Sequence, residues 1–178
     1  MRKAILAVAV CLVIPFPLAL ARNPSSQAKG SSQGANSQHP PGNAHAAMNE
    51  RGEKGMGFSQ TATTHHFLLN PTGGAIQVEA KDPADSANRD MIRMHLQHIA
   101  HAFAAGDFDI PMFIHDRIPP GVPQMKRLRA DIHYSYQETP RGGRVEITTA
   151  DKEARDAIWK FLRFQITEHK TGDPLHAR

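Results

Sequence analysis

Cysteine is nearly absent from this sequence. The 178 residues contain one, Cys11, which lies in an apolar run near the N-terminus. Downstream of that run, the absence of cysteine excludes disulfide bonds, thiolate catalysis, cysteine-based zinc sites and covalent attachment of haem. The fold must therefore be held together by its core, without covalent cross-links.

A net charge of one sign is also missing from residues 58–178, which contain 15 Lys and Arg against 15 Asp and Glu. The formal charge of +4 arises in the first 57 residues, where six basic side chains outnumber two acidic ones. A domain that binds nucleic acid would concentrate positive charge in its folded part. The sequence thus predicts no nucleic-acid partner.

One long hydrophobic run occurs, within residues 1–21, "MRKAILAVAVCLVIPFPLALA". Arg2 and Lys3 precede an apolar stretch that two prolines interrupt, and an A-x-A motif ends at Ala21. This order is typical of a secretory signal peptide rather than of a membrane anchor. We expect cleavage after Ala21, a periplasmic or extracellular location, and no membrane span in the processed chain.

Residues 22–57 have few large apolar side chains and are rich in Ser, Gln, Asn, Gly, Pro and Ala. Such a segment buries too little apolar surface to offset the conformational entropy lost on folding. We therefore predict a disordered spacer over residues 22–57 and a single globular domain over residues 58–174.

The globular part begins with a regular pattern. "TTHHFLL" (63–69) and "AIQVEAK" (75–81) alternate in polarity around the turn "NPTGG", which predicts a β-hairpin. A helix then follows from Asp82 or Asp85 to about Ala105. The same order returns as "DIHYSYQET" (131–139), "PRGG", "RVEITT" (144–149) and a helix from Asp151 to about His169.

The two halves share residues in register, which indicates an internal duplication. "DSANRDMIRMHL" (85–96) and "DKEARDAIWKFL" (151–162) have Asp, Arg-Asp, Ile and Leu at one offset. Near their starts the hairpins carry the pairs His66-Phe67 and His133-Tyr134. We predict an α+β fold of two ββα repeats, about 63–105 and 131–169, joined by a long loop, 106–130. The expected ββαββα arrangement has an antiparallel sheet, both helices on one face, and pseudo-two-fold symmetry.

Four segments between Gly57 and Gly172 carry a resemblance: "TTHHF", "HLQHIA", "PPGVP" and "FLRFQITEH". In these segments the chain resembles a group of uncharacterised exported bacterial proteins. The resemblance implies an exported domain and implies no activity.

The segment "MIRMHLQHIAH" (91–101) concentrates side chains that can bind metal. On a helix, Met91, His95 and His98 form a strip along one edge of the apolar stripe. Imidazole and thioether ligands suit copper, with Met favouring Cu(I), and a His with a Met or second His could also hold haem. In the competing interpretation, the histidines pack against aromatic rings or bond to the backbone, and Met91 fills the core.

Two other segments could complete a metal site. Neighbouring residues of a strand point to opposite faces, so only one of His65 and His66 can face the helices. His65 is the inward one if Phe67 packs in the core. The connection between the repeats adds Met112 and His115, and long connections of this kind often bind or cover something.

Enzymatic motifs are missing: there is no HExxH, P-loop, GxGxxG or nucleophile elbow. His115 and Asp116 remain an alternative acid-base pair. The sequence therefore predicts a non-catalytic exported domain that binds a metal ion or small ligand, copper first and haem second, as a carrier or sensor. The alternative is a structural or protein-interaction module of the cell envelope with no bound metal.

Overall fold

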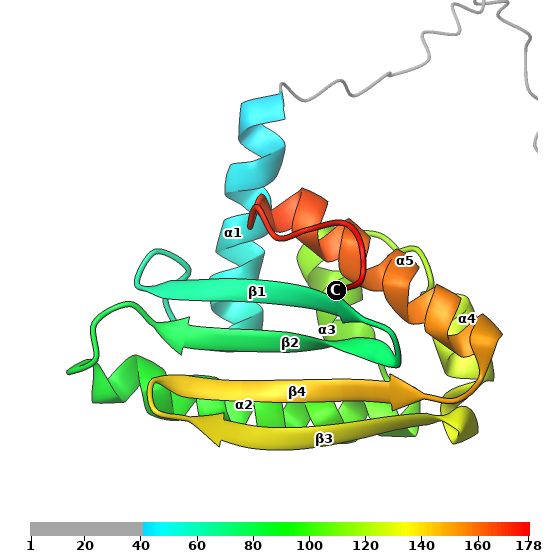
Figure 1. Cartoon of the computed structure of the whole chain (residues 1–178). Coiled ribbons are helices and arrows are strands. Elements are labelled where there is room, and N and C mark those ends of the chain that lie inside the picture. Colours follow the sequence, from blue (N-terminus) through cyan, green and yellow to red (C-terminus); the bar gives the residue numbers. More distant parts are fainter. Residues whose placement is uncertain (1–40) are drawn as a thin grey trace, which may run out of the picture. The chain divides into compact units, whose positions relative to one another are not determined.

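The computed structural model describes residues 41–178 (Figure 1). The predicted signal peptide and residues 22–40 of the predicted spacer lie outside the described residues. The elements in chain order are α1 (Pro41–Met56), β1 (Thr63–Asn70), β2 (Gly73–Ala80), α2 (Ser86–Ala105), α3 (Asp109–His115), α4 (Val122–Arg127), a 3-10 turn (Arg129–Asp131), β3 (Ile132–Thr139), β4 (Gly142–Thr149) and α5 (Lys152–His169). Of the helices formed by residues 41–178, none combines the length and apolar character needed to cross a bilayer.

The four strands form one antiparallel sheet in the order β1-β2-β4-β3. Each hairpin closes with a two-residue turn, and β2 pairs with β4 at the centre of the sheet. Two backbone hydrogen bonds, each 2.9 Å, tie the hairpins together: Ala80 N–H donates to Arg141 O, and Thr149 N–H donates to Thr72 O. These two bonds are equivalent under the duplication. The α+β fold with two ββα repeats is therefore confirmed.

The duplication extends to the helix caps. Asp85 and Asp151 are the N-caps of α2 and α5, and each accepts a hydrogen bond from the backbone N–H three residues later, at 3.0 Å and 2.7 Å. This satisfies one of the free N–H groups at each helix start. The hairpins repeat 69 positions apart, whereas the caps are 66 apart. The equivalent of His65 is therefore Tyr134, and the predicted pairing of His66 with His133 was wrong by two positions.

Both long helices pack on the same face of the sheet, as predicted. A Cβ atom on Gly74 would lie 2.3 Å from Leu162 Cδ1, and one on Gly143 would lie 3.3 Å from Leu96 Cδ1. Each helix thus packs on the hairpin of the other repeat, and Figure 1 shows α2 running behind β4 and β3. Leu96 and Leu162 are at most 1% exposed. The two repeats therefore share one core.

Residues 41–56 correct the predicted spacer, because they form helix α1. Met48 and Met56 of this helix are buried in the core cluster with Phe58. The helix is also held by Arg51, whose Nε donates to Ile114 O at 2.8 Å. Helix α1 has so few apolar residues that the composition of the segment does not indicate a folded helix. These residues stabilise the helix only because α3 provides an apolar surface against which they pack.

The predicted loop 106–130 also has more structure than expected, since it contains α3, α4 and the 3-10 turn. Phe108 is fully buried, and its ring stacks on that of Phe103 with centroids 4.3 Å apart. Met125 is likewise buried, whereas Phe113 and Ile118 are exposed. The segment therefore forms short helices that cover the end of the core. The last residue of α3, His115, is buried.

Candidate functional site

A cavity of about 60 Å³ lies among β1, β2, α2, α3 and α5. Most of its walls are apolar. Its polar lining consists of His65, His95, His115, His169 and Gln165. We call this the histidine cavity. Strand β1 supplies His65, α2 supplies His95, α3 supplies His115, and α5 supplies the other two.

Alternation along β1 places His65 in the cavity. Phe67 is buried, with 4% of its surface exposed, so the residue two positions before it projects from the same covered face. His66 consequently projects from the opposite face of the sheet. The sequence predicts that His65 faces the helices if Phe67 packs in the core. Phe67 does pack there, so His65 is the inward residue.

The rings of the cavity form one continuous cluster. His65 and His169 stack nearly parallel, with centroids 5.8 Å apart and planes at 12°. His169 meets His115 edge to face at 5.1 Å. Phe58 bridges the cluster to α2, because its ring lies 5.8 Å from His65 and 5.5 Å from His95.

His115 is held by a buried hydrogen bond. Its Nε2 lies 2.9 Å from Gln165 Oε1, so Nε2–H donates to the amide oxygen. In that tautomer the ring Nδ1 carries a lone pair. The nearest carboxylate oxygen, of Glu168, is 3.9 Å from Nδ1, too far for a hydrogen bond, and Glu168 pairs with Arg117 at 2.7 Å.

Two ring nitrogens of the cavity are buried and lack a hydrogen-bond partner among residues 41–178: His65 Nε2 and His115 Nδ1. The side-chain nitrogen of Gln165 is in the same condition within this part of the chain. Buried polar atoms in proteins are nearly always paired, and the exceptions often mark a missing ion or water. The histidine cavity therefore has unused binding capacity.

The inner histidines are uncharged at neutral pH. Burial lowers the pKa of His65 and of His95 to about 4 and that of His169 to about 3. Neighbouring imidazoles lower these pKa values further, because adjacent positive charges would repel each other. Burial also lowers the pKa of His115, although its hydrogen bond and the Glu168 carboxylate oppose the change. Neutral imidazole is the form that binds metal ions.

The structure brings three of the predicted site residues together and leaves four outside. His65, His95 and His115 line the cavity. His98 is exposed and Met91 is 36% exposed, so the predicted strip on α2 divides between cavity and solvent. Met112 lines a separate surface hollow on α3, and His66 lies on the far face of the sheet.

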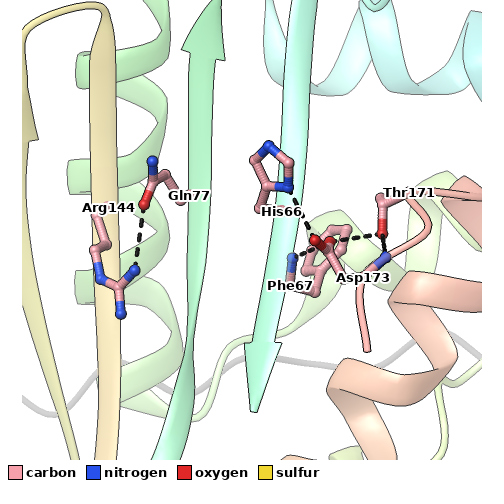
Figure 2. Close-up of polar contacts among 6 residues, drawn as sticks. All are labelled: His66, Phe67, Gln77, Arg144, Thr171 and Asp173. Atoms are coloured by element: carbon pink, nitrogen blue, oxygen red, sulfur yellow. Dashed lines mark hydrogen bonds and ion pairs between the residues drawn. The ribbon is translucent and has the colours of Figure 1, made fainter. Parts of the chain in front are cut away.

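His66 has a different partner, which Figure 2 shows. Its Nδ1 lies 2.9 Å from Asp173 Oδ1, while Asp173 Oδ2 accepts hydrogen bonds from Phe67 N–H at 2.9 Å and Thr171 Oγ1 at 2.7 Å. Burial alone would raise the pKa of Asp173, but these hydrogen bonds together hold it below its ordinary value. The C-terminal segment is thereby fastened to β1. Gln77 and Arg144, on the adjoining strands, form their own bond at 3.2 Å.

Sequence reasoning missed Gln165 and His169, although a signal for them exists. With the 66-residue offset between the helix caps, they correspond to Ile99 and Phe103 of α2, which belong to the buried stripe. Polar residues at two successive positions of a core stripe indicate a buried polar site. Met56, a third missed lining residue, lies on the helix assigned to the spacer.

As they stand, no three His, Cys, Asp or Glu side chains of residues 41–178 are arranged to hold a metal ion. The near-parallel rings of His65 and His169 illustrate the reason, because stacked imidazoles direct their nitrogens past each other. The cavity thus offers pairs of neighbouring imidazoles rather than a cage of three or four ligands.

Comparison of the chain with models of known protein families, with curated proteins and with solved structures gives no match.

Proposed function

We propose that this protein is an exported metal-binding domain that holds Cu(I) in the histidine cavity and acts as a carrier or sensor rather than as a catalyst. The observation that carries the proposal is that two buried ring nitrogens of one apolar cavity, His65 Nε2 and His115 Nδ1, have no hydrogen-bond partner among residues 41–178. Each of these nitrogens could serve as a ligand of a bound ion.

The number and type of ligands favour Cu(I). Cu(I) accepts two or three ligands and prefers imidazole and thioether groups, and Met56 also lines the cavity. Structural zinc sites almost always take four protein ligands in a tetrahedron. A cavity that offers pairs of imidazoles is better suited to the ion with the lower coordination number.

The charge of the cavity supports the same choice. His65, His95, His115 and His169 are neutral, and the residues that line the cavity within the described part of the chain include no Asp or Glu. The cost of moving an ion out of water rises with the square of its charge, so a dication without carboxylates would be strongly disfavoured. A monocation fits this environment better.

The size of the cavity favours an ion over haem. Pockets that hold small organic ligands usually measure about 300–1,000 Å³. The histidine cavity measures about 60 Å³. Haem would require α2, α3 and α5 to separate, whereas a single ion needs far less room.

A non-catalytic role agrees with the chemistry of the inner histidines. Their lowered pKa values make them weak bases at neutral pH, which is unsuitable for general base catalysis. Asp116, the alternative partner of His115, is exposed at the end of α3, and His115 Nε2 bonds to Gln165 instead.

Export rests on the pattern of residues 1–21 and is tested separately. The intact mass of the exported protein should correspond to a chain that begins at Arg22. A mass that includes residues 1–21 would contradict the secretion proposal without bearing on the cavity.

Metal binding is tested by titrating tag-free protein with Cu(I), under reducing conditions, against a chromophoric chelator. Wild type should bind one equivalent. His65→Phe should weaken binding about 10–100-fold or more, since it removes one of the two proposed ligand nitrogens. The control is His98→Phe, which makes the same change at an exposed position of α2 and should bind like wild type.

Absence of binding by the wild-type protein would contradict the proposal, and so would equal binding by both variants. In either case the histidines are structural, and the interaction module without metal becomes the better account. Circular dichroism melting of each variant separates loss of binding from loss of fold.

A further inference from the structure

The two edge strands of the sheet, β1 and β3, differ in whether another segment of the chain covers their outer edge. The outer edge of β1 is covered by the C-terminal segment: Phe67 N–H donates to Asp173 Oδ2 at 2.9 Å, and Leu69 O accepts from Arg178 N–H at 3.4 Å. Such coverage satisfies the outward backbone groups of an edge strand and prevents it from pairing with another chain.

The outer edge of β3 has no such cover in residues 41–178, where β4 is its single strand neighbour (Figure 1). The reason is a difference in the Gly-Asp pair that follows each long helix, Gly106-Asp107 after α2 and Gly172-Asp173 after α5. Asp107, which follows α2 as Asp173 follows α5, accepts from Asp109 N–H at 2.9 Å at the start of α3. The chain therefore turns away into α3 instead of returning along β3.

The outward backbone groups of β3 follow from its hairpin. In a two-residue hairpin the residues that flank the turn form a hydrogen-bonded pair, and the direction of the N–H and C=O groups alternates along the strand. Phe67 and Leu69 point outward in β1. Their equivalents in β3, 69 positions later, are Tyr136 and Glu138, so Tyr134 also points outward.

This edge has only one of the usual devices against pairing, the charged side chain of Glu138, which pairs with Arg93 of the same chain at 3.0 Å. Strand β3, "IHYSYQET", contains no Pro, Lys or Gly, and its eight residues pair with β4 without a bulge. Natural edge strands are commonly blunted by such residues or by bulges. The edge is regular over its whole length.

We propose that β3 pairs antiparallel with β3 of a second copy of this chain, about a two-fold axis at Ser135, to form one eight-stranded sheet. This register places Tyr134 opposite Tyr136 twice, on the face covered by the helices. His133 then lies opposite Gln137, and Glu138 lies opposite Ile132, so that no like charges meet. The same patch meets itself, as a two-fold interface requires.

The two tyrosine rings provide independent support. Tyr134 and Tyr136 are only partly buried where they pack against the core. Cross-strand pairing of Tyr134 with Tyr136 of the second copy would cover more of both rings, and aromatic pairs across antiparallel strands stabilise strand pairing. A foreign strand without aromatic side chains at this register would lack this contribution.

Sedimentation of the purified tag-free protein over a range of concentrations tests the proposal. Wild type should sediment as a dimer. Ser135→Lys should give monomers, because it sets two ammonium groups opposite each other on the two-fold axis, and Ser135→Glu should do the same. An equimolar mixture of the two variants should regain the dimer, since opposite charges then meet.

Thr64→Lys is the matched control, because it adds the same charge on the same sheet face at the covered edge strand and should leave the dimer intact. Thermal melting of each variant verifies the fold. A monomeric wild type would overturn the proposal. A dimeric Ser135→Lys variant, or a mixture that stays monomeric, would place any interface elsewhere and would overturn it equally.

Discussion

Gln165 fixes the orientation and tautomer of His115: its Oε1 lies 2.9 Å from His115 Nε2, and both side chains are buried. Because Nε2–H donates, the lone pair of Nδ1 remains for a ligand. Metal-binding histidines in general donate their second ring nitrogen to an oxygen that holds the tautomer. Gln165 occupies this position relative to His115.

Replacing Gln165 by Leu should therefore impair both stability and binding. The buried Nε2–H of His115 would lose its acceptor, which should lower the free energy of unfolding by about 1–3 kcal/mol. Cu(I) affinity should fall about 10–100-fold as the tautomer is released. Chemical denaturation and chelator competition measure the two effects, and Gln165→Glu, which keeps an acceptor oxygen, is the control. Affinity unchanged in Gln165→Leu would show that His115 is not a ligand.

Stability should depend on pH because the inner histidines are buried without charge. Their pKa is about 4 in the folded protein for His65 and His95, and about 3 for His169, against about 6.5 in the unfolded chain. Between these values the unfolded chain binds more protons, so the free energy of unfolding should fall as pH decreases from about 6.5 to about 4. Urea denaturation at several pH values measures this slope.

His95→Phe should reduce the slope, since it removes one of the titrating groups, whereas Met94→Phe, at an exposed position of α2 and without a titrating group, should leave it unchanged. A free energy of unfolding that stays constant between pH 7 and pH 4 would mean that the histidines are not buried in neutral form.

Cu(I) binding should resist acidification more than binding by exposed histidines does. Protons compete with the ion only when pH approaches the pKa of the free ligands. Because burial lowers the pKa of His65 to about 4 and also lowers that of His115, affinity should fall less steeply between pH 7 and pH 5 than it would for imidazoles of ordinary pKa. Competition titrations, corrected for protonation of the chelator, measure this dependence. A steep fall between pH 7 and pH 5 would contradict binding by the inner histidines.

The shared core should make the two repeats energetically alike. Leu96→Ala and Leu162→Ala each leave a cavity over a sheet glycine of the other repeat, so each should lower the free energy of unfolding by about 2–5 kcal/mol. Met94→Ala, at an exposed position of α2, should have an effect within about 0.5 kcal/mol. A small effect at either leucine would contradict the packing of α2 and α5 on opposite hairpins.

The parts of the fold that could be predicted from the sequence are those with local signals. Asp85 and Asp151 mark the helix starts because capping depends on residues only three positions away. The hairpins follow from alternation and two-residue turns. Helix α1 could not be predicted, because Met48 and Met56 stabilise it through contacts with distant elements.

The site was predictable in part for the same reason. His65, His95 and His115 stand out by residue type, and alternation with Phe67 shows which face His65 occupies. His169 is adjacent to His65 only in three dimensions, through the crossing of α5 onto the first hairpin. The sequence indicates His169 as a site residue only when His169 is compared with its equivalent in the other repeat, Phe103. That comparison needs the 66-residue offset of the helices, which the sequence alone did not distinguish from the 69-residue offset of the strands.

The most direct test of the central claim is to follow the ring nitrogens of all histidines by NMR while Cu(I) is added, because Cu(I) is diamagnetic and leaves the resonances observable. The account predicts that one equivalent shifts the ring nitrogens of His65 and His115, with smaller changes at His95 and His169. The rings of His66, His98 and His101 should remain unchanged. Shifts confined to these exposed histidines, or no shift at any inner ring, would contradict metal binding in the histidine cavity.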